Sequence, residues 1–326
     1  MISTYKKFIR NNDDVVSFIK NNYNNKIKNE AVIYNGIIIS IYGNLENYID
    51  SIFYELLKIY FKYSNKSLPG KLLSKYKKYF ADNLINPQRY GLDIHEKDLI
   101  RDYLNILELK YQNIESKELF LKHPGNLKAE KIIQLMAEFD INEPKLQILN
   151  DSVFKNFYTD IVGLDDNDFA TKKDKKSDGL FKYVDEIVDQ RNYIAHGSDN
   201  YNRIKVDDIT CYNVPFINCF GKTILKVLLK KSALYSEQNT YSSIKLLKIF
   251  DKKILCLHIS GIRISKNDYI VYKIKDDTYI SEIIRIEINH NEIEFINNDE
   301  CDIGIEIDDR LNSSDGFELL EIINVN

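Results

Sequence analysis

Three polar residues in one short stretch of the chain have the types that phosphate chemistry needs. The stretch QRNYIAHG occupies residues 190–197 and contains Arg191, Asn192 and His196. A histidine with an ordinary pKa of about 6.5 can take or deliver a proton near neutral pH. An arginine stays cationic and can hold two phosphate oxygens while negative charge accumulates on them. These residues therefore suit proton transfer and charge stabilisation at a phosphate, with Asn192 orienting the phosphate or the imidazole.

The segment before these residues predicts a helix with one anomaly on its apolar face. Leu180, Val184 and Ile187 recur at spacings of four and three, which is typical of a buried helix face. The next positions in this series are Arg191 and Ile194. A guanidinium group thus stands where a hydrocarbon side chain is expected.

The predicted helix, residues 180–195, cannot by itself direct both charged groups to one point. Residues five apart on an ideal helix lie about 140° from each other, which separates Arg191 from His196. Gly197 allows the helix to end around His196. A two-fold axis can also supply a second set of side chains. We therefore expect a composite cleft between two copies of the chain.

The rest of the first 250 residues also has helical periodicity. A long helix is predicted over 31–63, where one apolar face comprises Ile38, Tyr42, Leu45, Ile49, Ile52 and Leu56. Shorter helices are predicted over 70–83, 95–107, 126–138 and 145–157. The charged stretch 163–179 lacks apolar periodicity and indicates a loop. Residues 205–231 indicate a closing helix that is irregular at Pro215.

Beyond about residue 250 the period changes to two, which indicates strands. The alternating apolar positions are Ile284, Ile286, Ile288, Ile293, Phe295, Ile303, Ile305 and Ile307. Short strands with tight polar turns predict a small barrel, because an open sheet would leave unprotected edges. The predicted fold class is α+β, with an all-α bundle over 1–248 followed by a small β-barrel over 249–326.

Charge divides unevenly along the chain of 326 residues. Residues 251–326 hold 8 Lys and Arg against 17 Asp and Glu, whereas the preceding residues hold 37 against 32. Phosphate-rich ligands should therefore approach the N-terminal part. The four cysteines have no CxxC spacing, and we see no signal peptide or membrane segment, so we expect reduced thiols in a cytoplasmic protein.

Two sequence elements together resemble the HEPN superfamily. DEIVDQRNYIAHG, residues 185–197, resembles its signature of Arg, a polar residue, three further residues and His, here Arg191, Asn192 and His196. GIIISIYGNLENYIDSIFYELL, residues 36–57, is similar to its helix with an apolar face broken by an acidic residue, here Glu46. The resemblance covers roughly residues 25–235 and is closest to the RiboL-PSP-HEPN branch.

This resemblance implies a helical bundle, a homodimer that brings two motifs together and, in active members, cleavage of RNA without a metal. His196 would take the proton from a ribose 2′-OH or deliver one to the 5′-oxygen, and Arg191 would bind the phosphate. Glu46, facing the motif helix, would offset the cost of burying Arg191 and fix its rotamer. Requiring the 2′-OH excludes DNA as the substrate. We expect neither a cofactor nor a metal site.

A structural interpretation of the same residues remains open. Arg191 and Glu46 can form an ion pair with no catalytic role, and His196 can simply cap a helix end. The resemblance then implies a non-catalytic HEPN subunit that binds nucleic acid or a partner protein and regulates a neighbouring effector. The other histidines, His95, His123, His258 and His290, have no partner pattern and are expected at the surface or in turns.

Two groups of lysines are candidate RNA contacts. Lys75 and Lys78 are interleaved with aromatic residues in KLLSKYKKYF, which can bind a phosphate backbone and stack a base. The alternative is a solvated lysine face. A second group lies just before the motif helix and comprises Lys172, Lys173, Lys175 and Lys176.

The C-terminal residues 262–322 resemble the β-barrel that forms domain two of translation GTPases. The similarity lies in ISKNDYI, NDECDIGIEI and SSDGFEL, with Asn267 and Asn298 in place of the customary glycines. The resemblance implies contact with tRNA or another translation-related RNA, while the acidic charge favours a partner protein equally. A barrel that only stabilises a dimer is the third possibility. Together the resemblances imply a bacterial endoribonuclease of phage defence or a toxin, with tRNA as the first substrate to consider.

Overall fold

The computed structural model describes most of the chain, namely residues 1–22, 30–63, 68–85, 96–116, 118–123, 125–175, 178–197, 202–235, 244–274, 277–297, 300–308, 311 and 317–323. A helical part is followed by an antiparallel sheet, which confirms the predicted α+β class. Two compact units divide within the last helix: apart from residue 2, residues 1–225 form the first unit and residues 226–326 belong to the second. None of the described helices combines the length and apolarity that crossing a bilayer requires.

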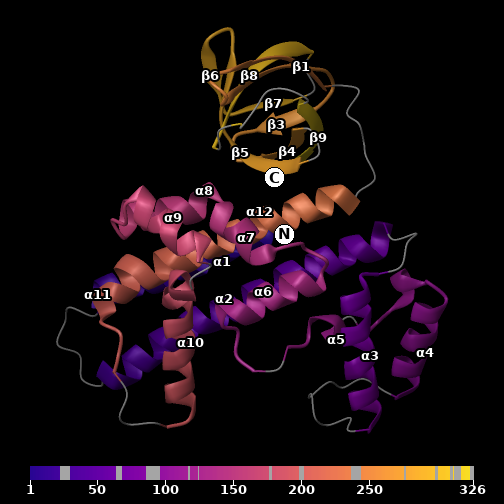
Figure 1. Ribbon diagram of the computed structural model, residues 1–326, viewed down its shortest axis with the longest axis vertical. Coiled ribbons are helices and arrows are strands. Elements are labelled where there is room, and N and C mark those ends of the chain that lie inside the picture. Colours follow the sequence, from indigo (N-terminus) through magenta and orange to yellow (C-terminus); the bar gives the residue numbers. More distant parts are fainter. Residues whose placement is uncertain are drawn as a thin grey trace. The chain divides into compact units, whose positions relative to one another are not determined.

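The helical elements follow one another along the chain (Figure 1). They are α1 (Ile2–Asn22), α2 (Glu30–Tyr63), α3 (Gly70–Ile85), α4 (Glu96–Leu107), η1 (Tyr111–Asn113), α5 (Glu118–Leu121), α6 (Ala129–Glu138), α7 (Pro144–Asn150), α8 (Ser152–Asn156), η2 (Phe157–Ile161), α9 (Asp166–Asp174), η3 (Asp178–Phe181), α10 (Lys182–Ala195), α11 (Val206–Asp208), η4 (Ile209–Asn213) and α12 (Val214–Tyr235).

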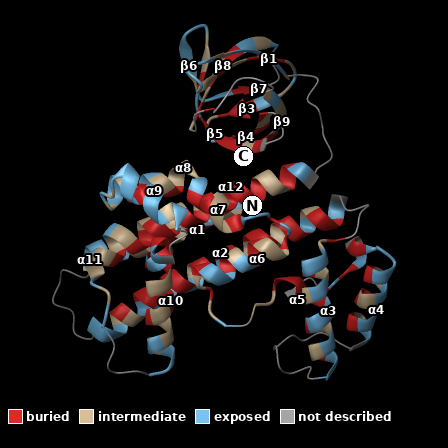
Figure 2. Ribbon diagram, viewed as in Figure 1, coloured by how far each residue is buried: buried red, intermediate tan, exposed pale blue. Residues whose placement is uncertain are grey.

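Helix α2 is the central element of the helical unit, and its predicted extent is confirmed. Its predicted buried face is at most 3 % exposed, as is seen for Tyr42, Leu45 and Ile49. Further buried residues such as Tyr48 and Phe53 widen that face. Figure 2 shows the buried residues concentrated along α2 and α12. The motif helix α10 packs directly on α2, so its position depends on this core.

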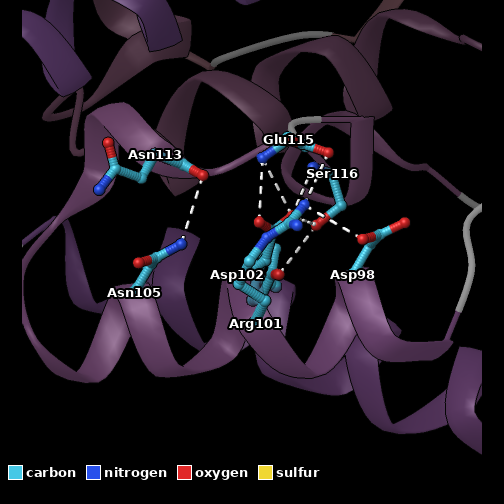
Figure 3. Close-up of polar contacts among 8 residues, drawn as sticks. Asp98, Arg101, Asp102, Asn105, Asn113, Glu115 and Ser116 are labelled. Carbon is cyan, nitrogen blue, oxygen red and sulfur yellow. Dashed lines mark hydrogen bonds and ion pairs between the residues drawn. The ribbon is translucent and has the colours of Figure 1, made fainter.

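A buried carboxylate organises the connection from α4 to α5 (Figure 3). Asp102 is fully buried and accepts hydrogen bonds from the Glu115 amide (3.1 and 3.0 Å), the Ser116 amide (2.6 Å) and the Ser116 hydroxyl (2.5 Å). The Ser116 hydroxyl also lies 3.0 Å from the Tyr76 hydroxyl of α3. Because all these partners are internal, the cluster fixes the connection to α5 against helix α3.

Three of the sequence predictions need correction. The stretch 163–179 contains helix α9, because the Asp165 carboxylate caps the Asp168 amide and Phe169 is buried against Tyr158. The predicted helix 145–157 is divided at Asp151, whose extended backbone ends α7 and whose side chain caps Val153 at the start of α8. The predicted helix 126–138 begins only at residue 129.

The predicted irregularity near Pro215 is confirmed. A π-helical turn, η4, immediately precedes α12. Proline cannot donate a backbone hydrogen bond, so the preceding turn is free to widen. This turn places the buried Asn213 against α10, where its amide donates to the Tyr183 carbonyl (2.9 Å) and to Glu186 (3.1 Å).

The second unit is an antiparallel half-barrel. Its strands are β1 (Ile244–Phe250), β2 (Ile254–Ile259), β3 (Arg263–Ser265), β4 (Tyr269–Ile274), β5 (Asp277–Ile288), β6 (Asn291–Ile293), β7 (Phe295–Asn297), β8 (Cys301–Ile307) and β9 (Phe317–Ile323). The sheet order is β1-β2-β8-β5-β4-β9, with β6 on β5 and a separate β3-β7 pair. Among the described strands, β1 pairs only with β2 and β9 only with β4. Because these two edge strands do not pair with each other, the sheet is open and the predicted closure into a barrel is wrong.

The predicted alternation is confirmed on β8, wrong on β7 and wrong on β5 only at Ile284, since Ile286 is buried and Ile288 packs against the same core. Ile303, Ile305 and Ile307 of β8 are at most 3 % exposed. On β5 a register shift against β8 lies between Ile283 and Arg285, so Ile283 and Ile286 face the core and Ile284 is exposed. On β7, Ile296 is buried and Phe295 is exposed. A single irregular residue moves every later side chain to the other face.

Candidate functional site

The motif helix α10 is held along its length by polar contacts. The Asp185 carboxylate accepts from the Ala129 amide at the start of α6 (2.9 Å). The Gln190 side chain accepts from the Tyr34 hydroxyl (2.8 Å) and donates to the Asn202 carbonyl (2.7 Å). Buried Val184 and Ile187 pack the same helix into the core. The orientation of the residues that follow is therefore fixed from both sides.

Helix α10 ends where the glycine predicts. His196 is the C-cap residue, with φ −92° and ψ 3°, and Gly197 follows with φ +64°. This left-handed backbone favours glycine and terminates the helix. The His196 side chain is exposed, and its imidazole forms no hydrogen bond or ion pair with a described residue. The imidazole can therefore meet a ligand or another protein chain.

Arg191 is half-buried and contacts two residues that sequence reasoning did not identify. Its Nη1 donates to Asn126 Oδ1 (3.1 Å), and its Cζ lies 5.0 Å from the centroid of the Tyr42 ring. A guanidinium at this distance from an aromatic ring makes a favourable cation–π contact. Asn126 lies in the connection before α6, far from the motif in sequence. The charge is thus accommodated by an amide and an aromatic ring.

Glu46 approaches Arg191 only through Tyr42. The Tyr42 hydroxyl donates to Glu46 Oε1 (3.0 Å) and accepts from the Leu127 amide (3.4 Å). No ion pair joins Glu46 and Arg191, both of which lie in described helices. Burial, together with the nearby Glu46 carboxylate, raises the pKa of Tyr42 to about 12. The Tyr42 ring therefore takes the place that the expected Arg191–Glu46 contact would occupy.

Asn192 carries an unsatisfied buried atom. Its Oδ1 is buried and has no hydrogen-bond partner within the described part of the chain. An unpaired buried acceptor costs about 1–3 kcal/mol, so such atoms are uncommon; among the described residues Asn213 Oδ1 and Ser265 Oγ are the others. Asn192 stands between Arg191 and His196, at the end of α10 that holds the exposed imidazole. The free acceptor, the guanidinium and the imidazole thus lie within two turns of one helix.

The two lysine groups lie on different helices of the same unit. Lys172 and Lys173 are in the last turn of α9, and Lys175 is its C-cap residue. Lys176 lies outside the described residues. Lys75 and Lys78 are on α3 and line a pocket with residues of α6. No described contact joins either group to Arg191 or His196, so their part in RNA binding stays a prediction.

His123 differs from the expected isolated histidine. Its Nε2 lies 3.3 Å from the Asp50 carboxylate, and its Nδ1 lies 3.3 Å from the Gly125 carbonyl. The hydrogen bond to Asp50 raises the pKa of His123 despite the opposing effect of burial. Asp50 follows Glu46 by one turn of α2. His123 and Asn126 are three residues apart in the stretch HPGN, and they contact Asp50 and Arg191, respectively, which no spacing in the sequence indicates.

Among the described residues, no group of three His, Cys, Asp or Glu side chains is arranged to hold a metal ion. The groups at the end of α10 instead offer a proton carrier, a fixed cation and a hydrogen-bond acceptor. These groups define a helical domain with a candidate phosphate site at a helix terminus.

Residues 6–224, well over half of the chain, match the RiboL-PSP-HEPN family. The chain belongs to this family, and its helical unit is a HEPN domain. HEPN domains are commonly ribonucleases. No match was found among curated proteins.

Proposed function

We propose that the chain is an endoribonuclease that cleaves RNA without a metal, at a site that two copies of the chain complete. The observation that carries the proposal is the end of α10. There an exposed His196 follows Asn192, whose buried amide oxygen has no partner in the described structure, and the half-buried Arg191. Family membership adds support, because this motif in a HEPN domain commonly belongs to a ribonuclease.

The proposed reaction begins with transfer of the ribose 2′-OH proton to His196. The 2′-oxygen attacks the adjacent phosphorus, and the 5′-oxygen leaves with a proton from His196 of the partner subunit. The products are a 2′,3′-cyclic phosphate and a 5′-hydroxyl end. Asn192 Oδ1 accepts a hydrogen bond from a ribose hydroxyl or from an imidazole N–H.

Arg191 stabilises the negative charge that develops on the phosphate oxygens. The hydrogen bond to Asn126 occupies one N–H group of the Arg191 guanidinium, and an arginine has five such groups. Tyr42 covers one face of the guanidinium, which fixes the group without neutralising its charge. A cation held in place by neutral partners is well suited to a phosphate, because no carboxylate competes for it.

A second subunit is part of the proposal because one chain does not complete the site. On an ideal helix Arg191 and His196, five residues apart, would diverge by about 140°. A two-fold axis near the end of α10 would bring the partner's His196 to the opposite side of the same phosphate. General acid and general base would then come from different subunits.

The substrate we propose first is tRNA or another translation-related RNA. The sequence of residues 262–322 resembles domain two of translation GTPases, and we propose that this part of the chain selects a component of translation. Its net charge of −9 over residues 251–326 opposes direct RNA binding, so contact with a partner protein is an equal option. We propose a role in phage defence or as a toxin, in the cytoplasm of a bacterium.

Growth of cells expressing the protein tests the proposal. Wild-type protein should arrest growth, and His196→Ala and Arg191→Ala should each relieve the arrest. Lys77→Ala, at an exposed lysine on α3, is a matched control that should remain toxic. Equal toxicity of all four proteins would contradict the catalytic assignment.

One observation favours a second function, that of a non-catalytic HEPN subunit. The contacts of Arg191 with Asn126 and Tyr42 lie within one chain and satisfy part of its hydrogen-bonding capacity without any ligand. Such a subunit would bind nucleic acid or a partner protein and regulate a neighbouring effector. Retained RNA binding by wild type and His196→Ala alike, with cleavage by neither, would identify this function.

A further inference from the structure

A pocket of about 300 Å³ lies between α3 and α6, within the helical unit. Its charged lining residues are Lys75, Lys78, Lys122, His123, Lys131 and Glu138. Four lysines against one carboxylate make the pocket strongly cationic, even with a neutral histidine. Such a concave cationic surface concentrates anions from solution.

Glu138 forms an ion pair with Lys75. Its Oε2 lies 2.7 Å from Lys75 Nζ, and the two side chains are only 20 % and 10 % exposed. Burial lowers the pKa of Lys75, and the Glu138 carboxylate opposes this change. Lys78 and Lys131, by contrast, are exposed and form no ion pair with a described residue. The excess positive charge therefore lies with Lys78 and Lys131.

The remaining walls suit a group larger than a bare anion. Tyr79 and Leu135 are 5 % and 2 % exposed and form an apolar surface. Gln134 and Ser74 add an amide and a hydroxyl. Pockets that bind small molecules have volumes from about 300 Å³ upward and combine apolar walls with a few polar groups. The size and lining match one nucleotide.

The pocket is built on fixed elements. Helix α3 is held through Tyr76, whose hydroxyl lies 3.0 Å from the Ser116 hydroxyl of the Asp102 cluster (Figure 3). On the other side, the contact with Asp50 fixes His123. Because these supports lie within the helical unit, the pocket can bind a ligand without a rearrangement of the backbone.

We propose that this pocket binds a phosphate-bearing ligand of about one nucleotide in size. Lys78 and Lys131 hold the phosphate, and the attached group lies against Tyr79. The ligand is either a free nucleotide or one nucleotide of an RNA chain, since both present the same chemistry. The proposal does not depend on cleavage at His196.

Binding of adenosine 5′-monophosphate by the full chain tests this site. Calorimetry at low ionic strength should show binding to His196→Ala, used so that cleavage cannot contribute, and inorganic phosphate should compete. Adding Lys78→Ala and Lys131→Ala should weaken binding about 100-fold, since each lost charge-assisted hydrogen bond costs about a factor of ten. Lys78→Arg with Lys131→Arg should retain binding.

A matched control and a second probe decide the source of the ligand. Lys77→Ala, at an exposed lysine of α3 outside the pocket lining, should bind as His196→Ala alone does. A 2′-O-methyl oligoribonucleotide has no 2′-OH to attack the phosphorus, so the proposed reaction cannot cleave it. If only this oligonucleotide binds, with the same dependence on Lys78 and Lys131, the pocket holds a nucleotide of an RNA chain. Absence of binding by both probes, or equal losses in Lys77→Ala and the double variant, overturns the proposal.

Discussion

Two buried polar sites of the helical unit differ in how they are satisfied. In the middle of α4, the Asp102 carboxylate accepts hydrogen bonds from Glu115 and Ser116 and forms a closed cluster (Figure 3). At the end of α10, Asn192 Oδ1 is buried with no partner among the described residues, and the nearby His196 is exposed. The polar groups of the first site are paired with one another, whereas at the second site the described residues offer Asn192 Oδ1 no partner.

We therefore expect substitutions at the two sites to differ: those at Asp102 should lower stability, and those at the end of α10 should lower cleavage. A buried acceptor that is fully paired stabilises one conformation, and removing it leaves donors unsatisfied. A buried acceptor without a partner costs stability in the isolated chain and gains its partner only on binding.

Removal of the imidazole should have the largest effect on activity. We expect His196→Ala to lower RNA cleavage by about 10²–10⁴-fold, the usual contribution of a general acid or base. Because the side chain is exposed, the free energy of unfolding should change by less than about 0.5 kcal/mol. Initial cleavage rates and urea melts measure the two quantities. A large loss of stability in His196→Ala would show that His196 supports the fold and would contradict this prediction.

Removal of the Asp102 carboxylate should lower stability and leave RNA cleavage unchanged. Asp102→Ala should lower the free energy of unfolding by about 3 kcal/mol, because hydrogen bonds to a buried charge are lost together. Cleavage per folded molecule should remain close to wild type. Asp98→Ala is the matched control: its ion pair with Arg101 (3.1 Å) is half-exposed and should contribute less than about 1 kcal/mol. Equal destabilisation by both variants would contradict the account.

Neighbouring amides on α10 allow a direct comparison of paired and unpaired groups. Asn192→Leu removes an acceptor that has no partner, so stability should stay within about 1 kcal/mol of wild type while cleavage falls about tenfold. Gln190→Leu leaves the Tyr34 hydroxyl and the Asn202 carbonyl without their partner and should cost about 2 kcal/mol. Chemical denaturation of both variants gives the result. A larger loss of stability in Asn192→Leu than in Gln190→Leu would show that Asn192 is structural.

The His123–Asp50 pair should have the smallest effect, visible as a pH dependence. Asp50 raises the pKa of His123 above its ordinary value of about 6.5. The stabilisation is therefore complete below that ordinary value and is lost as pH rises through the raised pKa of the folded state. Since Asp50 is half-exposed, we expect less than about 1 kcal/mol. Asp50→Asn should lower the melting temperature at pH 5.5 more than at pH 9; an equal change at both pH values would contradict the assignment.

The sequence predicted elements whose signals are local and repeated. The long apolar series placed α2 within one residue of its start, and Gly197 marked the end of α10. Helix α9 was missed because a single buried residue, Phe169, anchors it, and one residue produces no periodicity. On β5 only Ile284 was misassigned to the inward face, because it lies at a bulge, and a bulge has no consistent signature in the residue types.

The candidate site was predictable in its residues and not in their partners. Arg191, Asn192 and His196 were identified from type and spacing. Asn126 and Tyr42 come from other helices or connections, and contact between segments far apart in sequence depends on packing that no short pattern encodes. The Arg191–Glu46 contact was expected from the resemblance of residues 36–57 to the acidic helix of the family, whereas the structure places Tyr42 between the two residues, so that a cation–π contact replaces the ion pair.

The chemistry of the RNA ends tests the central claim most directly. Purified protein would be incubated with tRNA in the presence of EDTA, and the new termini would be identified by sequencing and by phosphatase sensitivity. We predict 2′,3′-cyclic phosphate and 5′-hydroxyl ends with wild-type protein and none with His196→Ala. Termini with a 3′-hydroxyl, cleavage that EDTA abolishes, or unchanged cleavage by His196→Ala would contradict an acid–base mechanism at the end of α10.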